Sequence, residues 1–389
     1  MKKILFPVVT FMALSAAAEA SALTVGEMVR LVESRSISLR ADSLACEAAV
    51  LDARADNTLA PLSIEYSPFF RPGAHGVASS ELIVSQEFDF PTLYASRDRQ
   101  ARLDGAAALA SIGGTRREIM MEARDACLDW ILVSRTDSIL SMRLENSRQI
   151  LSTMERRFER REVTQLDVNR VRLEIQDIER ELIDNGVQLT AVRGRLEAMA
   201  PGLEFPADGL TYDSTDFSTS LDPADFARSH PSVVSAEAEA TAARHQVGLA
   251  KSAWLPSITL GYRRNTELDE ASNGFVVGAA FPIYSIGRKK KAAEARLAAA
   301  SLQLDAAAIE SERLAASTQA NIEALRKSAS SFDLALTYET ITLYRRSLDA
   351  GQITLTEYYA GITPLYDRLL LQARVVNDLH RALTPLLLP

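Results

Sequence analysis

The sequence predicts a mainly α-helical fold that contains two separated β-hairpins and uses one structural unit twice. Three observations support this prediction. Helix-favouring Ala, Leu, Arg and Glu dominate the 389 residues, whereas Trp is scarce and Gly and Pro are modest in number. Short segments alternate between apolar and polar residues, as strands do. Two octapeptides are also similar, Phe-Pro-Thr-Leu-Tyr-Ala-Ser-Arg at 90–97 and Phe-Pro-Ile-Tyr-Ser-Ile-Gly-Arg at 281–288.

The first 22 residues are typical of a secretory signal peptide. Lys2 and Lys3 precede a short apolar stretch at 4–18, and residues 18–22 have the small-x-small pattern that signal peptidase cleaves. The apolar stretch is too short to cross a bilayer comfortably as a helix. We therefore expect residues 1–22 to be removed. No later stretch of eighteen apolar residues predicts a membrane-spanning helix.

The first repeat is predicted at 23–201 and begins with a helix over 23–57. Apolar residues recur there about every seven positions: Leu31, Ile37, Leu44 and Leu51. Pro61 ends this pattern, and a β-hairpin follows at about 61–90 around a turn-rich loop. The apolar residues that alternate with polar ones in its two strands are Leu62, Ile64, Tyr66, Leu82, Val84 and Phe88.

A helical hairpin is expected over residues 95–199. The helical period is continuous there, and the polar stretch 134–138, poor in helix formers, suggests a break between two arms. The second arm would then be on the order of 90 Å long. Its apolar positions suit a seam against neighbouring helices: Ile150, Met154, Phe158, Ile178, Leu182, Leu189, Val192 and Leu196.

A linker at 202–223, rich in Pro, Gly, Asp, Ser and Thr, leads to a second repeat at 224–389 with the same order of elements. A helix is expected at 224–252 and a β-hairpin at about 256–282, around a polar loop at 263–273. The alternating apolar residues of this hairpin are Ile258, Leu260, Tyr262, Phe275, Val277, Ala279 and Phe281. A second helical hairpin is expected at 288–386, with a break near 327–331.

Three landmarks occur in the same order in both halves, which indicates an internal duplication. The matches are Pro61 with Pro256, 195 positions apart, Phe90-Pro91 with Phe281-Pro282, 191 apart, and 158–167 with 348–357, 190 apart. Arg161 stands where the second copy has Gly351. The strand-to-helix turns of the two copies contain Phe90, Pro91, Phe281, Pro282, Gly287 and Arg288.

The four predicted strands are too few to close a barrel within one chain. Open strand edges would be exposed, and an isolated hairpin is only marginally stable in water. A length of about nine to eleven residues, with apolar residues on one face, suits a tilted strand that crosses a bilayer. We therefore expect several copies to pool their strands, and their helices to continue the barrel as a tube. The alternative is an ordinary soluble hairpin packed on helices.

The duplicated plan resembles the TolC-like outer membrane efflux family. Residues 275–288, Phe-Val-Val-Gly-Ala-Ala-Phe-Pro-Ile-Tyr-Ser-Ile-Gly-Arg, are similar to the family's strand that ends in a Pro-Leu-x-x-Gly-Gly-Arg-type turn. Residues 350–357, Ala-Gly-Gln-Ile-Thr-Leu-Thr-Glu, are similar to its Gly-x-x-Thr-x-x-Asp segment near the periplasmic tip. Ser-Gln-Glu-Phe-Asp at 85–89 also resembles the branch that serves heavy-metal and related resistance-nodulation-division (RND) pumps.

The resemblance covers essentially the whole mature chain and implies a homotrimer in the outer membrane. Its pooled strands would form a twelve-stranded transmembrane β-barrel, and its helices an α-helical tunnel that closes in the periplasm. It further implies a passive exit duct of a tripartite efflux system, docked through a periplasmic adaptor to an inner-membrane transporter of the RND type for cations or drugs. Type I protein secretion is an alternative, because its channel is built the same way. A periplasmic coiled-coil adaptor or structural protein is another, although it would lack the two membrane-length strand pairs.

The resemblance places the equivalent of Glu357 at the closed mouth of the tunnel. Three copies would form an acidic ring that attracts cations, whereas the alternative is a solvated surface carboxylate. Asp167, its partner in the first repeat, is expected to form an interhelical salt bridge. Leu348 and Ala360 stand where well-known members carry a gating Tyr and a second Asp, so the same aperture network is not expected. The candidate gate residues are Glu357, Asp167, Thr354 and Gly351.

A dense basic cluster lies near the same tip: Arg156, Arg157, Arg160 and Arg161. One interpretation is a docking or gating surface that pairs with carboxylates of a neighbouring helix or of the adaptor. The other is a solvated face, on which each ion pair adds little stability.

Other classes of function find little support in the sequence. The net charge of −8 argues against nucleic-acid binding. The histidines His75, His230, His245 and His380 are scattered without metal-ligand spacing. No catalytic constellation or phosphate-binding loop is recognisable, so we expect no enzyme activity, cofactor or metal site. Cys46 and Cys127 could form a disulfide in an oxidising compartment, but two small buried residues on separate helices are the favoured interpretation.

Overall fold

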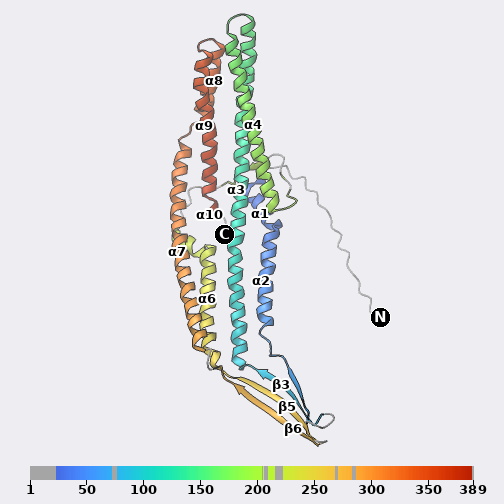
Figure 1. Ribbon diagram of the computed structural model, residues 1–389. Helices are drawn as coiled ribbons and strands as arrows, with labels where there is room; N and C mark the ends of the chain where they lie inside the picture. Colours follow the sequence, from blue (N-terminus) through green and yellow to red (C-terminus); the bar gives the residue numbers. More distant parts are fainter. Residues whose placement is uncertain are drawn as a thin grey trace, which may run out of the picture.

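The computed structural model of the chain describes residues 23–71, 77–203, 205, 209–214, 222–267, 270–282 and 286–387. The predicted signal peptide at 1–22 lies outside these residues. Long helices run side by side along one axis, and a β-sheet extends from one end of them (Figure 1). At the opposite end, the helices finish in two tips.

Residues 23–201 contain the predicted β-hairpin and helical hairpin, but the helix predicted over 23–57 is divided at Ser36 into two helices, because Ser36 is extended and caps the second of them. Their elements are β1 (Leu23–Thr24), α1 (Val25–Arg35), α2 (Ile37–Ala55), β2 (Ser63–Phe69), β3 (Ser79–Phe88), α3 (Pro91–Glu159) and α4 (Gln165–Met199). At 1.5 Å per residue, the 69 residues of α3 span on the order of 100 Å. Pro91 occupies the first turn of α3, where its missing N–H needs no partner.

The linker and the second repeat follow the same order. Their elements are β4 (Leu210–Thr211), α5 (Pro223–Ser229), α6 (Pro231–Lys251), the 3-10 helix η1 (Ser252–Trp254), β5 (Ser257–Glu267), β6 (Glu270–Ala280), α7 (Ile286–Ser330), α8 (Leu334–Asp349), α9 (Leu355–Ala382) and α10 (Thr384–Leu387). Over the described part of the chain, no helix combines the length and hydropathy that a bilayer crossing requires.

The break predicted at 134–138 is wrong, because α3 is continuous through this stretch and the chain reverses only at 160–164, before α4. Two hydrogen bonds explain how polar residues stay helical. The Ser138 hydroxyl donates to the Ser134 carbonyl at 3.1 Å. The buried Asn185 amide of α4 donates to the Val133 carbonyl at 3.0 Å. Packing against α4 therefore outweighs the weak local propensity.

The break predicted at 327–331 is confirmed in position, because α7 ends at Ser330. It is not a reversal, however. Asp333 caps α8 by accepting from the Leu336 N–H at 2.9 Å. Helix α8 then continues in the direction of α7, towards the tip that it forms with α9 (Figure 1). The chain reverses at 350–354, before α9.

The two β-hairpins join into one antiparallel sheet in the order β2-β3-β5-β6. The polar loop predicted at 263–273 is wrong, because β5 continues to Glu267 and β6 starts at Glu270. Cross-strand contacts hold these polar residues in the strands. Arg263 forms an ion pair with Glu81 of β3, and the Tyr262 hydroxyl lies 2.6 Å from the Asn273 side-chain oxygen.

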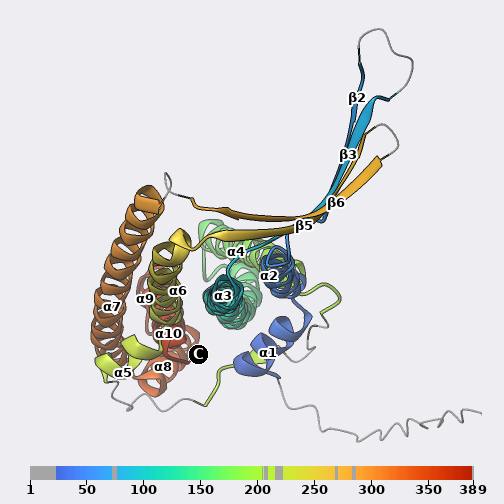
Figure 2. The same cartoon turned by 90° about the horizontal axis from the view of Figure 1, so that it is seen from below.

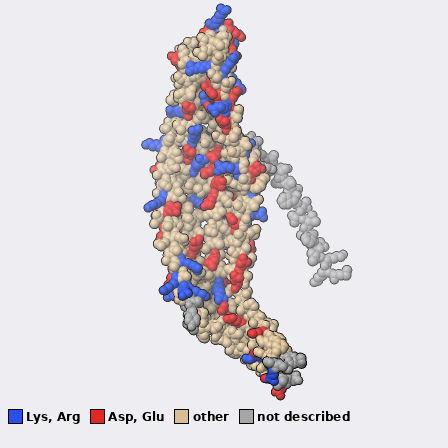
Figure 3. Space-filling model, viewed as in Figure 1, with Lys and Arg blue, Asp and Glu red and all other residues tan. Residues whose placement is uncertain are grey.

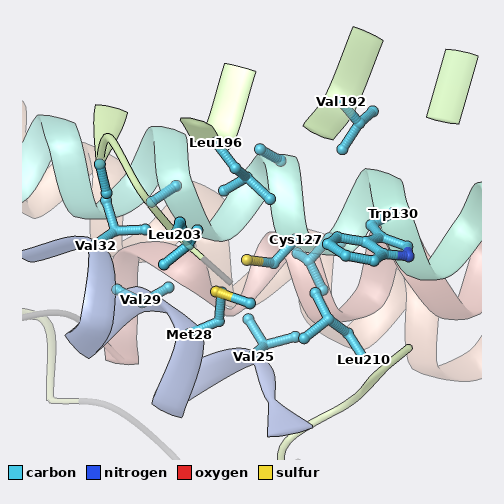
Figure 4. Packing of buried hydrophobic residues seen from close by; sticks show 14 of the residues in the cluster. Val25, Met28, Val29, Val32, Cys127, Trp130, Val192, Leu196, Leu203 and Leu210 are labelled. Carbon is cyan, nitrogen blue, oxygen red and sulfur yellow. The ribbon is translucent and has the colours of Figure 1, made fainter. Parts of the chain in front are cut away.

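The main hydrophobic core packs α1 on α3, α4 and the linker (Figure 4). Its labelled members are Val25, Met28, Val29, Val32, Cys127, Trp130, Val192, Leu196, Leu203 and Leu210. Asp213 of the linker accepts from the Gly26 N–H at 2.8 Å and from buried Arg124 at 2.7 Å. The linker is thereby fixed to both α1 and α3. Cys46 and Cys127 are buried free thiols on separate helices, as the favoured interpretation predicted.

The predicted seam of the first helical hairpin is largely confirmed. Ile150, Met154, Ile178, Val192 and Leu196 are buried, and Leu182 and Leu189 are half-buried. Phe158 is the exception, with 41% of its surface exposed at the end of α3.

Candidate functional site

One face of the sheet is apolar across all four strands. Residues directly opposite each other in an antiparallel sheet share a face, and the register aligns Ile64, Val84, Tyr262 and Phe275 in one row. The apolar residues of this face are Ile64, Tyr66, Leu82, Val84, Phe88, Ile258, Leu260, Tyr262, Phe275, Val277 and Ala279, and the polar residues Gln86, Arg264 and Asn273 lie on the same face. Phe275 is 91% exposed, so no residue of its own chain covers this face there. The alternation predicted from the sequence is confirmed.

The opposite face of the sheet is mostly polar or small. It carries Ser63, Glu65, Ser67, Glu81, Ser85, Glu87, Thr259, Gly261, Arg263, Gly274 and Gly278, with Phe69, Ile83 and Val276 as large apolar exceptions. A Cβ atom at Gly261 would lie 2.7 Å from the Val84 carbonyl oxygen, so β3 and β5 approach closely at this point. An apolar face and a polar face are the pattern of a strand between lipid and water.

The sheet has two free edges among the residues that the structure describes. β2 pairs only with β3, and β6 pairs only with β5. The outer N–H and C=O groups of β2 and β6 therefore await partners, and long free edges of this kind tend to pair with other strands.

The helices expose apolar stripes on two sides. On α2, the predicted series Ile37, Leu44 and Leu51 is 64%, 65% and 56% exposed. Similar spacing recurs on α4 with Leu166, Leu173 and Val187, on α7 with Leu302 and Ile309, and on α8 with Leu336 and Leu343, all exposed. Figure 2 shows α2 and α7 on opposite sides of the helical layer. Apolar residues every seven positions form a packing seam, so both sides can pack against further helices.

The two helical tips repeat one turn structure. In the first, the Glu162 N–H donates to the Arg157 carbonyl, and in the second the Gln352 N–H donates to the Ser347 carbonyl, both at 2.9 Å. Arg161 and Gly351 occupy equivalent positions with φ of 61° and 69°. The two turns that the sequence pairs thus share one backbone conformation.

Glu357 and Asp167 each cap their own helix. The Glu357 carboxylate accepts from the Thr354 N–H at 2.8 Å and from its hydroxyl at 2.9 Å. Asp167 accepts from Thr164 in the same way, at 2.9 and 2.7 Å. Hydrogen bonds from Thr354 lower the pKa of Glu357, and those from Thr164 lower the pKa of Asp167. Within the described residues Asp167 forms no ion pair with another helix, and its Oδ2 atom accepts both capping hydrogen bonds.

The basic cluster divides into one linking residue and three others. The Arg157 guanidinium donates to the carbonyls of Asp349, at 2.6 Å, and Leu348, at 3.4 Å, and so joins the end of α3 to the end of α8. Arg156 bonds to its own helix through the Ser152 carbonyl at 3.2 Å. Arg160 and Arg161 are exposed and form no ion pair with any residue in the described ranges.

Sequence reasoning missed two further contacts between the helical hairpins. The Arg170 guanidinium of α4 donates to the Thr356 hydroxyl of α9 at 2.8 Å. The buried Asn146 amide of α3 donates to the Tyr358 hydroxyl of α9 at 2.6 Å. Burial raises the pKa of the Tyr358 hydroxyl, which therefore stays neutral. A lone Asn in a helical pattern carries no signal of a distant partner, so only the fold reveals these links.

The strand-to-helix turns lie where the sheet meets the helices. Phe90 and Pro91 begin α3, and Phe281 and Pro282 follow β6. Gly287 and Arg288 lie in the exposed first turn of α7. Among the residues that the structure describes, no group of three His, Cys, Asp or Glu side chains could hold a metal ion.

Comparisons with known proteins agree with this architecture. Residues 224–387 match a family model described as outer membrane efflux protein. The fold is similar to that of a membrane protein from Pseudomonas aeruginosa, with a TM-score of 0.76, 17% identity, and 94% of this chain and 90% of that chain covered. It is similar to CusC, with a TM-score of 0.70, 16% identity and coverages of 93% and 92%. No curated protein matches the chain by sequence.

A further similarity is to VceC, an outer membrane protein of Vibrio cholerae, with a TM-score of 0.69, 16% identity, and 93% of this chain and 94% of that chain covered. At these identities the solved structures establish the fold over nearly the whole chain, and the family model covers the second repeat. The fold expected from the resemblance is confirmed over nearly the whole chain, and residues 224–387 match the outer membrane efflux protein family.

Proposed function

We propose that three copies of the chain assemble into one duct through the outer membrane. The observation that carries this proposal is the open sheet, whose apolar face is exposed and whose β2 and β6 edges are free in the described chain. Pairing β6 of one copy with β2 of the next satisfies both edges and, with three copies, closes twelve strands. The apolar face then turns towards lipid and the polar face towards a water-filled lumen.

The exposed stripes on the helices support the same assembly. The stripe on α2 and α4 of one copy would pack against the stripe on α7 and α8 of the next, since α2 and α7 lie on opposite sides of the helical layer (Figure 2). The pooled helices then form a tunnel that continues the barrel into the periplasm. One arrangement of copies thus covers both the free strand edges and the exposed leucines.

The duct is passive and serves a tripartite efflux system. Substrate is delivered by an inner-membrane transporter of the RND type, through a periplasmic adaptor that docks near the helical tips. The similarity of 85–89 to the heavy-metal branch favours cations or drugs as cargo. Exposed Arg160 and Arg161 offer unpaired charge at the tip for carboxylates of the adaptor.

The tips form the gate. Arg157 and Arg170 hold the two helical hairpins together in the present arrangement, so a gate that opens by separating the hairpins must release these contacts. Glu357, Thr354 and Gly351 form the second turn, and three copies of Glu357 would line the mouth with negative charge. Hydrogen bonds from Thr354 keep Glu357 ionised.

Single-channel recording in planar bilayers tests this function. We expect a discrete conductance that multivalent cations block from the tip side. Glu357→Gln should weaken this block at least several-fold, because it removes the charge while Gln still suits the capping position. Asp333→Asn is the matched control, because it removes a capping charge at the start of α8, at the end away from the tip.

Equal block in the wild type and in Glu357→Gln would show that Glu357 does not line the mouth of the tunnel. It would not contradict the duct. A purified protein that produces no conductance would contradict the duct.

A further inference from the structure

A hollow with an apolar floor lies where the sheet joins the helices. It has a volume of about 630 Å³ and lies between the first turns of α3 and α7, the end of α6 and the base of β5 and β6. Leu93, Leu249, Leu255, Phe281 and several alanines provide its apolar lining. Neither the duct nor its gate requires a cavity at this level.

The charged groups of the hollow are mainly cationic. Arg97 is paired with Asp89 at 2.6 Å, so these two charges balance. Lys289 and Arg296 are exposed on its wall and form no ion pair with any residue that the structure describes. They lie seven positions apart on α7, with Ala292 and Ala293 between them on the same face. Two unbalanced positive charges thus flank an apolar floor.

Lys289 belongs to a run of four cations, Arg288 to Lys291, in the first turns of α7. Positive side chains at a helix N-terminus oppose the helix dipole, so helix stability does not explain their presence. Only Lys290 has an acidic partner among the described residues, Glu294 at 3.7 Å. Figure 3 shows Lys and Arg gathered at this end of the helices, beside the start of the sheet.

Two exposed aromatic residues mark the same level of the molecule. Trp254, in η1 just before β5, is 57% exposed, and Phe281, just after β6, is 59% exposed. Aromatic side chains at the end of an apolar band are typical of the boundary between membrane and water. The apolar face of the sheet begins here, with Ile258 and Ala279.

We propose that this hollow binds an anionic phospholipid of the inner leaflet of the outer membrane. Lys289 and Arg296 contact the phosphate of the headgroup, and an acyl chain lies on the apolar floor beside Leu249 and Phe281. A phosphodiester with a net negative charge complements the two unpaired cations, and the acyl chain complements the apolar lining. The inference rests on the proposed function, because it requires the sheet to lie in the membrane.

Native mass spectrometry of the detergent-purified full chain, titrated with lipid, tests the site. The probes are phosphatidylglycerol and phosphatidylcholine with identical acyl chains. We expect phosphatidylglycerol to bind the wild type at least roughly tenfold more tightly, given the contribution of each Lys or Arg near an anionic headgroup. The double variant Lys289→Gln/Arg296→Gln should lose roughly tenfold or more of this affinity.

A matched control separates the site from overall charge. Arg313→Gln/Arg326→Gln makes the same change in charge at exposed positions farther along α7 and should bind phosphatidylglycerol like the wild type. Ala292→Leu narrows the hollow without altering its charge and should weaken binding several-fold. Equal binding of the two lipids, or equal losses in the two double variants, would overturn the site.

Failure of this site and failure of the duct are distinguishable. The conductance of the wild type is recorded on the same preparation. A conducting wild type that does not prefer phosphatidylglycerol contradicts the lipid site alone. A wild type that neither conducts nor enters bilayers contradicts the proposed function, and the lipid site with it.

Discussion

Two turns at the helical tips share a left-handed backbone position but not the residue that suits it. Gly351 adopts a φ of 69° without a side chain to clash, whereas Arg161 adopts 61° with one. A non-glycine residue in this region lowers the free energy of unfolding by about 1–2 kcal/mol. Replacing it with glycine recovers only part of this, because glycine has more conformational freedom in the unfolded chain. The described residues offer no ion pair to Arg161, so its charge is available to the adaptor of the proposed system.

Arg161→Gly should therefore stabilise the first turn by about 1 kcal/mol. The Glu162 N–H, which donates to the Arg157 carbonyl, reports this turn directly. Hydrogen exchange should show about fivefold greater protection at Glu162. Gly351→Ala should lower the protection at Gln352 in the second turn. Unchanged protection at Glu162 would show that the left-handed Arg161 is not strained.

His380 makes folding depend on pH. Its ring is buried and stacks on Tyr212 with centroids 4.0 Å apart. Burial, assisted by Arg124 and Arg135 and opposed by Asp213, lowers the pKa of His380 from an ordinary value near 6.5 to about 4. The unfolded chain therefore binds this proton first, and the stability from a neutral His380 is complete above pH 6.5 and is lost as pH falls towards 4.

His380→Phe keeps a stacking ring but cannot titrate. Between pH 7 and pH 4.5 the wild type should lose about 2 kcal/mol more unfolding free energy than this variant does. The measurement is denaturant unfolding at the two pH values. The tip carboxylates also lose stability on acidification, but they titrate equally in both proteins. Parallel losses in the two proteins would refute this role for His380.

At the scale of elements, close helix packing depends on a few small residues. Gly361 of α9 faces the ring of Tyr344 on α8, and a Cβ atom there would overlap that ring. A Cβ atom placed on Gly113, inside α3, would have no atom of a neighbouring element within 4 Å. The same substitution should therefore have opposite effects at the two sites.

Gly361→Ala should destabilise the α8–α9 pair by about 1–3 kcal/mol, because the helices must move apart. Gly113→Ala should stabilise α3 by about 0.5–1 kcal/mol, because alanine favours the helix. Thermal unfolding followed by circular dichroism compares them. If Gly361→Ala raised the midpoint as Gly113→Ala does, the close approach at Tyr344 would not exist.

The sequence predicted the strands better than the helix reversals, for a physical reason. Successive residues of a strand point to opposite faces, so the sequence alone shows which residues share the apolar face: Ile64, Val84, Tyr262 and Phe275. A polar stretch such as 134–138 resembles a loop, yet contacts with α4 keep it helical. The true reversals did carry a signal: the capping pairs Thr164 with Asp167 and Thr354 with Glu357.

The candidate site was predictable only in part. Matching 158–167 with 348–357 located both tips, but capping by Asp167 and the link from Arg170 to Thr356 depend on three-dimensional neighbours. Lys289 and Arg296 show a helical spacing, yet nothing in the sequence places them beside Phe281.

At the scale of the whole molecule, one chain leaves several surfaces unsatisfied. The described sheet has two free edges, its apolar face is open, and α2, α4, α7 and α8 expose leucine-rich stripes. An exposed apolar surface of this extent is unfavourable in water and favours association. In the proposed assembly, copies of the chain placed side by side in a membrane would cover all of these surfaces together.

The mass of the detergent-solubilised particle, corrected for bound detergent, tests this assembly most directly. Light scattering or native mass spectrometry should show three chains per particle, and removal of detergent should cause aggregation. A particle that contains one chain and stays monodisperse in water without detergent would contradict the assembly of copies on which the proposed duct depends.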